Sequence, residues 1–315
     1  MASAREKRLA VLTRIISPIR FCLVLFVFVP LVLGSLVHRI KIGNPPASEE
    51  YAYMPIEEVC FTTEDGLMLS GWFVPENNSD STVLICHGLG ANKGNFVEFV
   101  NLFLGRGYNS LIFDFRGHGD SDGHTCTFGL FETADVRAAV DWLKQQRPEQ
   151  SKHVFGLGSS MGAMALVRTA ASDQRIEAVV LDSCFVSAAA LARQHLGRIP
   201  IVGPAYGSLL LLSISVHAGA SIWDLNAGDA IAQISPRPVL LIHGQDDFVI
   251  PPANLSILYN AAAEPKDKWL GPGPHSNIMT TDFEGYQARV LEFFKRTLAT
   301  TSERPVQMAR PHESL

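Results

Sequence analysis

The chain has 315 residues, of which 47% are hydrophobic and 18% charged, and its net charge at pH 7 is −5. This length suits one large domain or two small ones. No basic cluster occurs beyond the N-terminal flank, so charge gives no indication of a nucleic-acid partner. A mean hydropathy of +0.15 is high for a purely soluble enzyme and directs attention to a membrane segment.

The N-terminal region contains a charge-free apolar run at residues 21–37. As a helix it would extend about 25 Å, slightly less than a bilayer core, and Arg20 and Arg39 could snorkel to close the gap. Because the flank at residues 1–20 is the more basic side, a single-pass transmembrane anchor would place the following domain on the non-cytoplasmic side. The alternative is a cleaved signal peptide and a secreted or periplasmic protein.

The sequence after this run predicts an α/β domain at residues 51–298. A linker at 38–50 precedes it, and a hairpin with strands at 59–62 and 68–74 begins it. Strands and helices are then predicted at residues 82–86, 96–105, 109–113, 130–146, 154–157, 163–171, 176–181, 239–243, 268–270 and 283–298. Such alternation predicts a mostly parallel sheet covered by helices on both faces. The polar tail at 299–315 is predicted to be disordered.

The strand predicted at residues 154–157 leads into the most informative motif, Gly158-Ser159-Ser160-Met161-Gly162. A helix-compatible segment follows directly, which is the layout of a nucleophile elbow. The two glycines suit the strained, crowded turn that such an elbow requires. Only Ser160 has glycines at both flanking positions, so Ser160 is the candidate nucleophile.

A serine hydroxyl needs a base to take its proton and a third group to orient that base. Asp247 lies in the polar turn after the strand at 239–243, and His275 lies in the loop after the strand at 268–270. The order serine, acid, histidine distinguishes this layout from other serine hydrolases. Asp246 is an alternative acid, and Asp247 could instead cap the helix predicted to begin near Pro252.

At these positions the chain resembles the α/β-hydrolase superfamily. The matching motifs are His87-Gly88 after a strand, Asp114-Phe115-Arg116-Gly117-His118-Gly119, the elbow at Ser160, and His243-Gly244-x-x-Asp247 with His275 downstream. The strongest likeness is to bacterial esterase- and lipase-like serine hydrolases related to prolyl-oligopeptidase-type catalytic domains. The resemblance implies an eight-stranded-type sheet, a Ser160-His275-Asp247 triad and structural roles for the 114–119 loop. It also leaves Asp182, just after the strand at 176–181, as an alternative acid. Pro274 replaces the glycine that often precedes the histidine and would stiffen that loop.

Two backbone N–H groups are expected to form an oxyanion hole. Met161 follows the nucleophile at the start of a helix, where free N–H groups favour negative charge. The resemblance implies that Leu89, in the loop after His87, supplies the second.

The segment at 185–236 is longer than a strand–helix–strand crossing needs. It contains an apolar run at 208–216 and is interpreted as a small helical cap over the site, with additional core packing as the alternative. Five cysteines are present without a metal-type spacing, and a disulfide between Cys126 and Cys184 stays open.

Together these features predict a serine hydrolase that cleaves carboxylic esters or thioesters of small molecules through an acyl-enzyme. No cofactor or metal is implied. The alternatives are a serine peptidase of the prolyl-oligopeptidase type, or a hydrolase-fold protein that binds a ligand without turnover. The peptidase is disfavoured because the related enzymes usually carry an N-terminal β-propeller.

Overall fold

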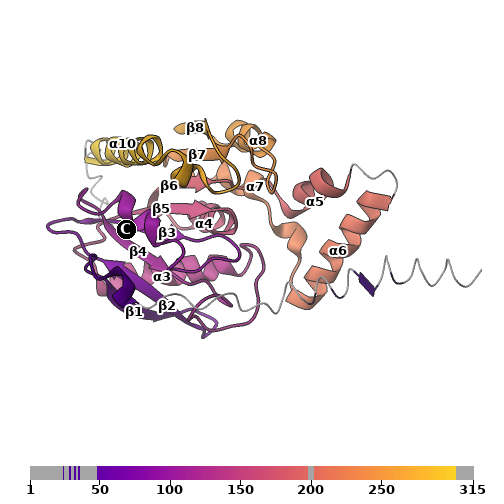
Figure 1. The fold of residues 1–315 in the computed structure, drawn as a ribbon, viewed down its shortest axis with the longest axis horizontal. Coiled ribbons are helices and arrows are strands. Elements are labelled where there is room, and N and C mark those ends of the chain that lie inside the picture. Colours follow the sequence, from indigo (N-terminus) through magenta and orange to yellow (C-terminus); the bar gives the residue numbers. More distant parts are fainter. Residues whose placement is uncertain are drawn as a thin grey trace, which may run out of the picture.

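The computed structural model describes residues 48–197 and 202–302, together with five isolated positions between 24 and 35. Its centre is an eight-stranded sheet with the strand order β1-β2-β4-β3-β5-β6-β7-β8 (Figure 1). In chain order the strands are Glu57–Thr62, Met68–Val74, Ser81–Cys86, Asn109–Phe113, His153–Ser159, Ile176–Asp182, Val239–Gly244 and Lys266–Gly271. β2 pairs antiparallel with both β1 and β4, and all later pairs are parallel, which confirms the predicted mostly parallel sheet.

The central strands are buried on both faces. Every residue of β3, β4 and β7 is buried, and the apolar run of β3 reads Thr-Val-Leu-Ile-Cys without alternation. Strands buried on both sides have this composition because helices cover each face of the sheet. The sequence pattern of β3 is therefore a direct consequence of its central position.

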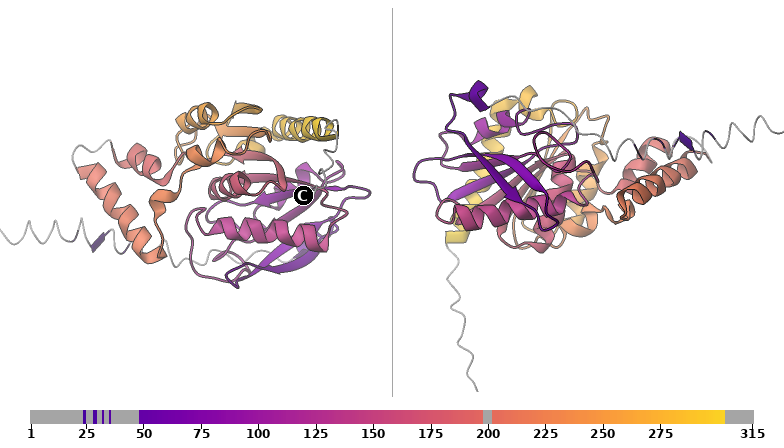
Figure 2. Two further views of the ribbon diagram at one scale, coloured as in Figure 1. Left: turned by 180° about the vertical axis from the view of Figure 1, so that it is seen from behind. Right: turned by 90° about the horizontal axis from the view of Figure 1, so that it is seen from below.

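Helices cover both faces of the sheet (Figure 2). On one face α3 (Glu132–Gln146), α4 (Met161–Ser172), α7 (Ala227–Ile231) and α8 (Ala253–Ala261) contribute to one apolar cluster. On the other face η3 (Val97–Leu102), α9 (Ile278–Thr281) and α10 (Phe283–Ser302) contribute to a second. The residues that α10 buries include Tyr286, Val290 and Phe294, whose spacing of four places them along one helix face.

The predicted helices differ from the structure at their ends, and two of them differ by three or more residues. The helix expected at 96–105 is the short 3-10 helix η3, flanked by glycines at positions 94 and 105. The helix expected to end at 298 continues to Ser302, so α10 includes the first residues of the predicted tail.

The segment predicted as a cap divides into two parts. α5 (Ala188–Leu196) and α6 (Val202–Ala218) project from one end of the sheet (Figure 1), and α6 packs against α5 and η4 (Ile222–Asp224). After η4 the chain returns to the body, where Leu225, Ala227 and Ile231 join the main apolar core. The projecting part is therefore confined to α5, α6 and η4.

The apolar run at 21–37 falls outside the described residues, apart from those isolated positions. In the part of the chain that is described, no helix is long and apolar enough to cross a membrane. The tail beyond Ser302 also lies outside the described residues.

Candidate active site

Ser160 occupies a strained turn between β5 and α4. Its φ is 54° and its ψ is −114°, a conformation that side-chain-bearing residues rarely adopt outside functional sites. Backbone crowding explains the glycines beside it: a Cβ at Gly162 would lie 2.2 Å from the Cys86 carbonyl oxygen, and one at Gly158 would lie 2.6 Å from the Gly162 carbonyl oxygen. The Ser160 N–H donates to the Asp182 carbonyl oxygen at 2.8 Å, which fixes the elbow to the end of β6.

The three predicted residues Ser160, His275 and Asp247 form one hydrogen-bonded chain. The distance from His275 Nε2 to Ser160 Oγ is 3.0 Å, and that from His275 Nδ1 to Asp247 Oδ2 is 2.7 Å. An ionised carboxylate can only accept, so the tautomer that fits both contacts carries its proton on Nδ1. In that tautomer Nε2 has a free lone pair directed at the Ser160 hydroxyl.

Asp247 is held as a buried carboxylate by several donors. Its Oδ1 accepts the N–H groups of Val249 and Ile250 at 2.9 and 2.7 Å, while His243 Nε2 lies 3.3 Å from Oδ2. Burial raises the pKa of this carboxyl, but the hydrogen bonds from His243, His275 and the Ile250 N–H outweigh that effect and hold the pKa well below its usual value. The group therefore stays ionised beside the His275 ring.

The two alternative acids are placed differently. Asp246 is exposed, and its backbone N–H donates to the Gly273 carbonyl oxygen. Asp182 is fully buried, and its carboxylate accepts the hydroxyl protons of Ser183 at 3.0 Å and Tyr286 at 3.1 Å. Among the described residues, neither side chain hydrogen-bonds to the His275 ring, so the geometry favours Asp247.

The two predicted oxyanion donors lie in segments next to Ser160. Met161 is the first residue of α4, where the backbone N–H has no acceptor within the helix. Leu89 is exposed and follows Gly88, whose position would bring a Cβ to 3.4 Å from Ser160 Cβ. His87 joins this loop to the loop after β4, because its Nε2 accepts the Phe115 N–H at 3.0 Å. Burial lowers the pKa of His87 to about 4, so its ring is neutral and structural.

The 114–119 motif builds a cluster of buried ion pairs, which we call the loop-tying cluster: Lys93, Asp114, Arg116 and Asp135. Lys93 Nζ lies 2.7 Å from Asp114 Oδ2, and Arg116 lies 2.7 Å from Asp135 Oδ1. Lys93 also contacts Asp120, and Arg116 also contacts Asp65. These pairs join the loops after β3 and β4 to α3 and the hairpin, as expected for a structural role.

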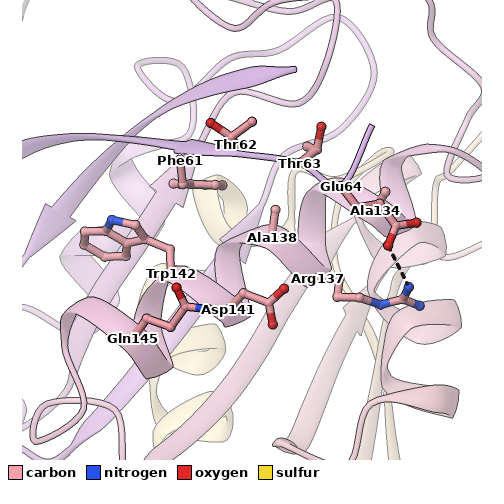
Figure 3. Close-up of a pocket in the computed structure, with 10 residues that line it drawn as sticks. All are labelled: Phe61, Thr62, Thr63, Glu64, Ala134, Arg137, Ala138, Asp141, Trp142 and Gln145. Atoms are coloured by element: carbon pink, nitrogen blue, oxygen red, sulfur yellow. Dashed lines mark ion pairs between the residues drawn. The ribbon is translucent and has the colours of Figure 1, made fainter. Parts of the chain in front are cut away.

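Two cavities of similar size differ in their relation to the site. One of about 380 Å³ lies between the end of β1 and α3 and is bordered by the Arg137–Glu64 ion pair (Figure 3). It contains none of the residues predicted to act in catalysis. A second, of about 340 Å³, lies between α5 and the loop that carries Asp247, with Gln194, His195 and Phe248 in its wall. Of the projecting helices, α5 therefore borders the loop that carries Asp247.

No group of three or more His, Cys, Asp or Glu side chains within residues 48–197 and 202–302 is arranged to hold a metal ion. Cys126 and Cys184 are free, buried thiols, so the disulfide left open by the sequence is not formed. Burial raises the pKa of both thiols, which keeps them protonated.

Three residues hold the buried carboxylates of Asp247 and Asp182, and of these only His243 belongs to a motif recognised in the sequence. His243 braces Asp247, while Ser183 and Tyr286 hold the Asp182 carboxylate. Ser183 could have been identified from its position directly after a buried strand, at the carboxyl ends of the strands where ligands bind in α/β folds. Tyr286 lies on a distant amphipathic helix, and its hydroxyl gave no local signal.

The family model described as "Serine aminopeptidase, S33" matches residues 77–211. Among curated proteins, the uncharacterised protein YfhR of Salmonella typhimurium is 30% identical over 294 residues, which cover 86% of this chain and 94% of that protein. The uncharacterised protein Rv2307c of Mycobacterium tuberculosis is 32% identical over 251 residues, covering 78% of this chain and 80% of the relative.

Solved structures with this fold include a protein described as an esterase. Esterase Pf2001 of Pyrococcus furiosus superimposes with a TM-score of 0.65 at 28% identity, covering 82% of this chain and 98% of that one. The α/β hydrolase GrgF from a Penicillium species superimposes with a TM-score of 0.63 at 22% identity, covering 78% and 100% of the two chains. The second comparison concerns the fold alone.

Proposed function

Because this chain belongs to the α/β-hydrolase superfamily, we propose that it is a serine hydrolase that cleaves carboxylic esters or thioesters, with Ser160 as its nucleophile. The observation that carries the proposal is the hydrogen-bonded chain from Ser160 Oγ through His275 to Asp247. The esterase description of the Pyrococcus protein supports the choice of substrate class.

The proposed reaction begins when the Ser160 hydroxyl gives its proton to His275 Nε2 and Oγ attacks the acyl carbon. The Leu89 and Met161 N–H groups stabilise the charge that develops on the carbonyl oxygen. Asp247 keeps the imidazole in the required tautomer and stabilises its cation. His275 then returns the proton to the leaving alcohol or thiol, and water releases the acyl group by the same route.

Active-site labelling tests the proposal. A fluorophosphonate should label the wild-type protein at Ser160, and Ser160→Ala should abolish the labelling while leaving the unfolding temperature unchanged. Ser159→Ala is the matched control, because the neighbouring hydroxyl is buried and has no hydrogen-bond partner among the described residues. The Ser159→Ala variant should still be labelled at Ser160. A folded wild-type protein that does not react would overturn the proposal and favour a ligand-binding protein without turnover.

A serine aminopeptidase is the second candidate, because the matching family model carries that description. An aminopeptidase must hold the free ammonium of its substrate as well as the scissile carbonyl. Turnover of short acyl esters can therefore be compared with that of aminoacyl amides of equal side-chain size. A preference for the amides that disappears when the amine is acetylated would establish the second candidate.

Two further assignments complete the proposal. We propose that α5 and α6 form a cap that sets substrate preference, since α5 borders the cavity beside Asp247. We also propose that residues 21–37 tether the protein to a membrane, with the hydrolase domain on the non-cytoplasmic side. Mature N-terminal sequencing and carbonate extraction of membranes distinguish this anchor from a cleaved signal that yields a secreted protein.

A further inference from the structure

The end of β6 holds a pair of residues, Asp182 and Ser183, that the proposed reaction does not use. Both are fully buried. Ser183 has a φ of 51°, in the left-handed region that non-glycine residues avoid. Such strain persists where the surroundings over-determine the conformation, and it concentrates at functional sites.

The contacts of this pair reach the elbow at Ser160, the strand that leads to Asp247 and the loop of His275. The Asp182 carbonyl oxygen accepts the Ser160 N–H at 2.8 Å, and the Ser183 N–H donates to the Ile242 carbonyl oxygen, in β7, at 2.9 Å. The Ser183 hydroxyl accepts the Ser276 N–H at 3.1 Å, directly after His275. Asp182 thus borders the nucleophile, while Ser183 holds the loop of the base.

The hydroxyl of Ser183 is oriented by its neighbour. It donates to Asp182 Oδ1 at 3.0 Å, which turns its lone pairs towards the Ser276 N–H. Tyr286 in turn donates to Asp182 Oδ2 at 3.1 Å and fixes the carboxylate against α10. Ser276 also has a positive φ, 54°, so the hydrogen bond stabilises a backbone that serine does not adopt readily.

We propose that Asp182 and Ser183 are positioning residues that set the distance between Ser160 and His275. The inference rests on the proposed function. Both side chains are fully buried, so neither is placed to contact a substrate. They act through the backbone N–H groups of Ser160 and of Ser276, the residue after His275. Proton transfer from Ser160 to His275 requires these two side chains to lie within hydrogen-bond distance. Releasing the Ser276 N–H lets the His275 loop shift, and a displacement of about 1 Å can cost about 100-fold in rate.

Ser183→Gly is the decisive variant, because glycine accepts the left-handed backbone but lacks the hydroxyl. We expect kcat for ester hydrolysis and the rate of fluorophosphonate labelling to fall about 10- to 100-fold, with KM unchanged. Ser151→Ala is the matched control. It also removes a buried hydroxyl, one that donates to Leu143 and Arg147 carbonyl oxygens at the opposite end of the sheet. This control should lower the unfolding temperature without changing the labelling rate.

A second measurement does not depend on turnover. The His275 Nδ1 proton, hydrogen-bonded to Asp247, is expected to give a downfield proton resonance that is absent from His275→Ala. In Ser183→Gly this resonance should shift or broaden, and in Ser151→Ala it should stay in place. An unchanged resonance together with a wild-type labelling rate would overturn the positioning role. A wild-type protein that never labels but shows the resonance shift would instead refute the proposed function.

Discussion

The candidate active site and the loop-tying cluster both bury charge just beyond the carboxyl ends of the strands, but the hydrogen bonds that start at these charges end differently. Asp114 is fully buried, and its two oxygens accept the Lys93 ammonium and the N–H groups of Lys93 and Asp120. Both carboxylate oxygens of Asp114 therefore accept hydrogen bonds from fixed protein donors. In the active site, Asp247 is equally buried, but the chain of contacts from it ends at a serine hydroxyl that can change partners.

The comparison separates two uses of buried charge. A saturated network ties loops together, because each charge has a fixed partner and none is free to move a proton. An open-ended chain can move a proton, because the tautomer of His275 leaves one lone pair facing a reactive group. Substitutions in the first should therefore alter stability, and substitutions in the second should alter rate.

The largest expected effect concerns the hydrogen bonds that join Asp247, His275 and Ser160. Asp247→Asn keeps the size of the side chain but cannot hold the same tautomer, so kcat should fall by about 10⁴-fold. Asp246→Asn, one residue away and exposed, is the control and should retain the wild-type rate. Steady-state ester hydrolysis measures both. The reverse pattern would move the acid to Asp246 and remove Asp247 from the comparison.

Substitutions in the loop-tying cluster should lower the free energy of unfolding. Asp114→Ala leaves Lys93 buried without its enclosed counter-charge, and the free energy of unfolding should fall by about 3–5 kcal/mol. Asp120, the other partner of Lys93, has a side chain that is 57% exposed. Asp120→Ala should therefore cost less than about 1 kcal/mol. Urea unfolding followed by circular dichroism measures both losses, and equal losses would show that the cluster is not organised around Asp114.

Asp182 is a buried carboxyl group that belongs neither to the loop-tying cluster nor to the Ser160–His275–Asp247 chain. Burial raises the pKa of this carboxyl to about 6, although Ser183 and Tyr286 donate to it. The folded chain then binds a proton more tightly than the unfolded chain, so Asp182 makes stability fall as pH rises from about 4 to about 6, by about 2–3 kcal/mol. Asp182→Asn should remove that component. Urea unfolding at pH 4 and pH 7 measures it, with exposed Asp267→Asn as the control; a variant as pH-sensitive as the wild type would refute the prediction.

The smallest expected effect concerns the rim of the site. Phe248 follows Asp247 directly, and 86% of its surface is exposed. If apolar acyl groups bind beside it, Phe248→Ala should raise KM for long-chain esters by about 3- to 10-fold, the loss of about 1 kcal/mol of apolar burial, with stability unchanged. Met68→Ala, an exposed apolar residue on the hairpin, should change neither. An unaltered KM would place the acyl group elsewhere.

Much of the fold was predictable from the sequence, because its signals are local. The apolar runs of the central strands and the glycines around Ser160 each report on a few neighbouring residues. The serine, acid and histidine were found by their order, and the structure brings Ser160, Asp247 and His275 together. Their catalytic roles stay predictions.

What the sequence did not reveal depends on contacts between distant residues. The Tyr286 hydroxyl meets Asp182 across a separation of 104 residues, and Ser276 meets Ser183 across 93. No periodicity encodes such a pairing, because it follows from the strand order rather than from either segment alone. The same is true of α7, whose apolar residues looked like part of the cap until the chain path returned them to the core.

The separation of 115 residues between Ser160 and His275 also has a consequence for how the protein acquires its reactivity during folding. The two side chains meet only when β5, β6, β7 and β8 have aligned in one sheet, and such distant pairings form slowly. A chain still emerging from the ribosome carries Ser160 before it carries His275, so under the proposed mechanism its hydroxyl stays inert until the segment with His275 has been made and has joined the sheet. Recovery of fluorophosphonate labelling after dilution from urea would therefore time the closing of the sheet.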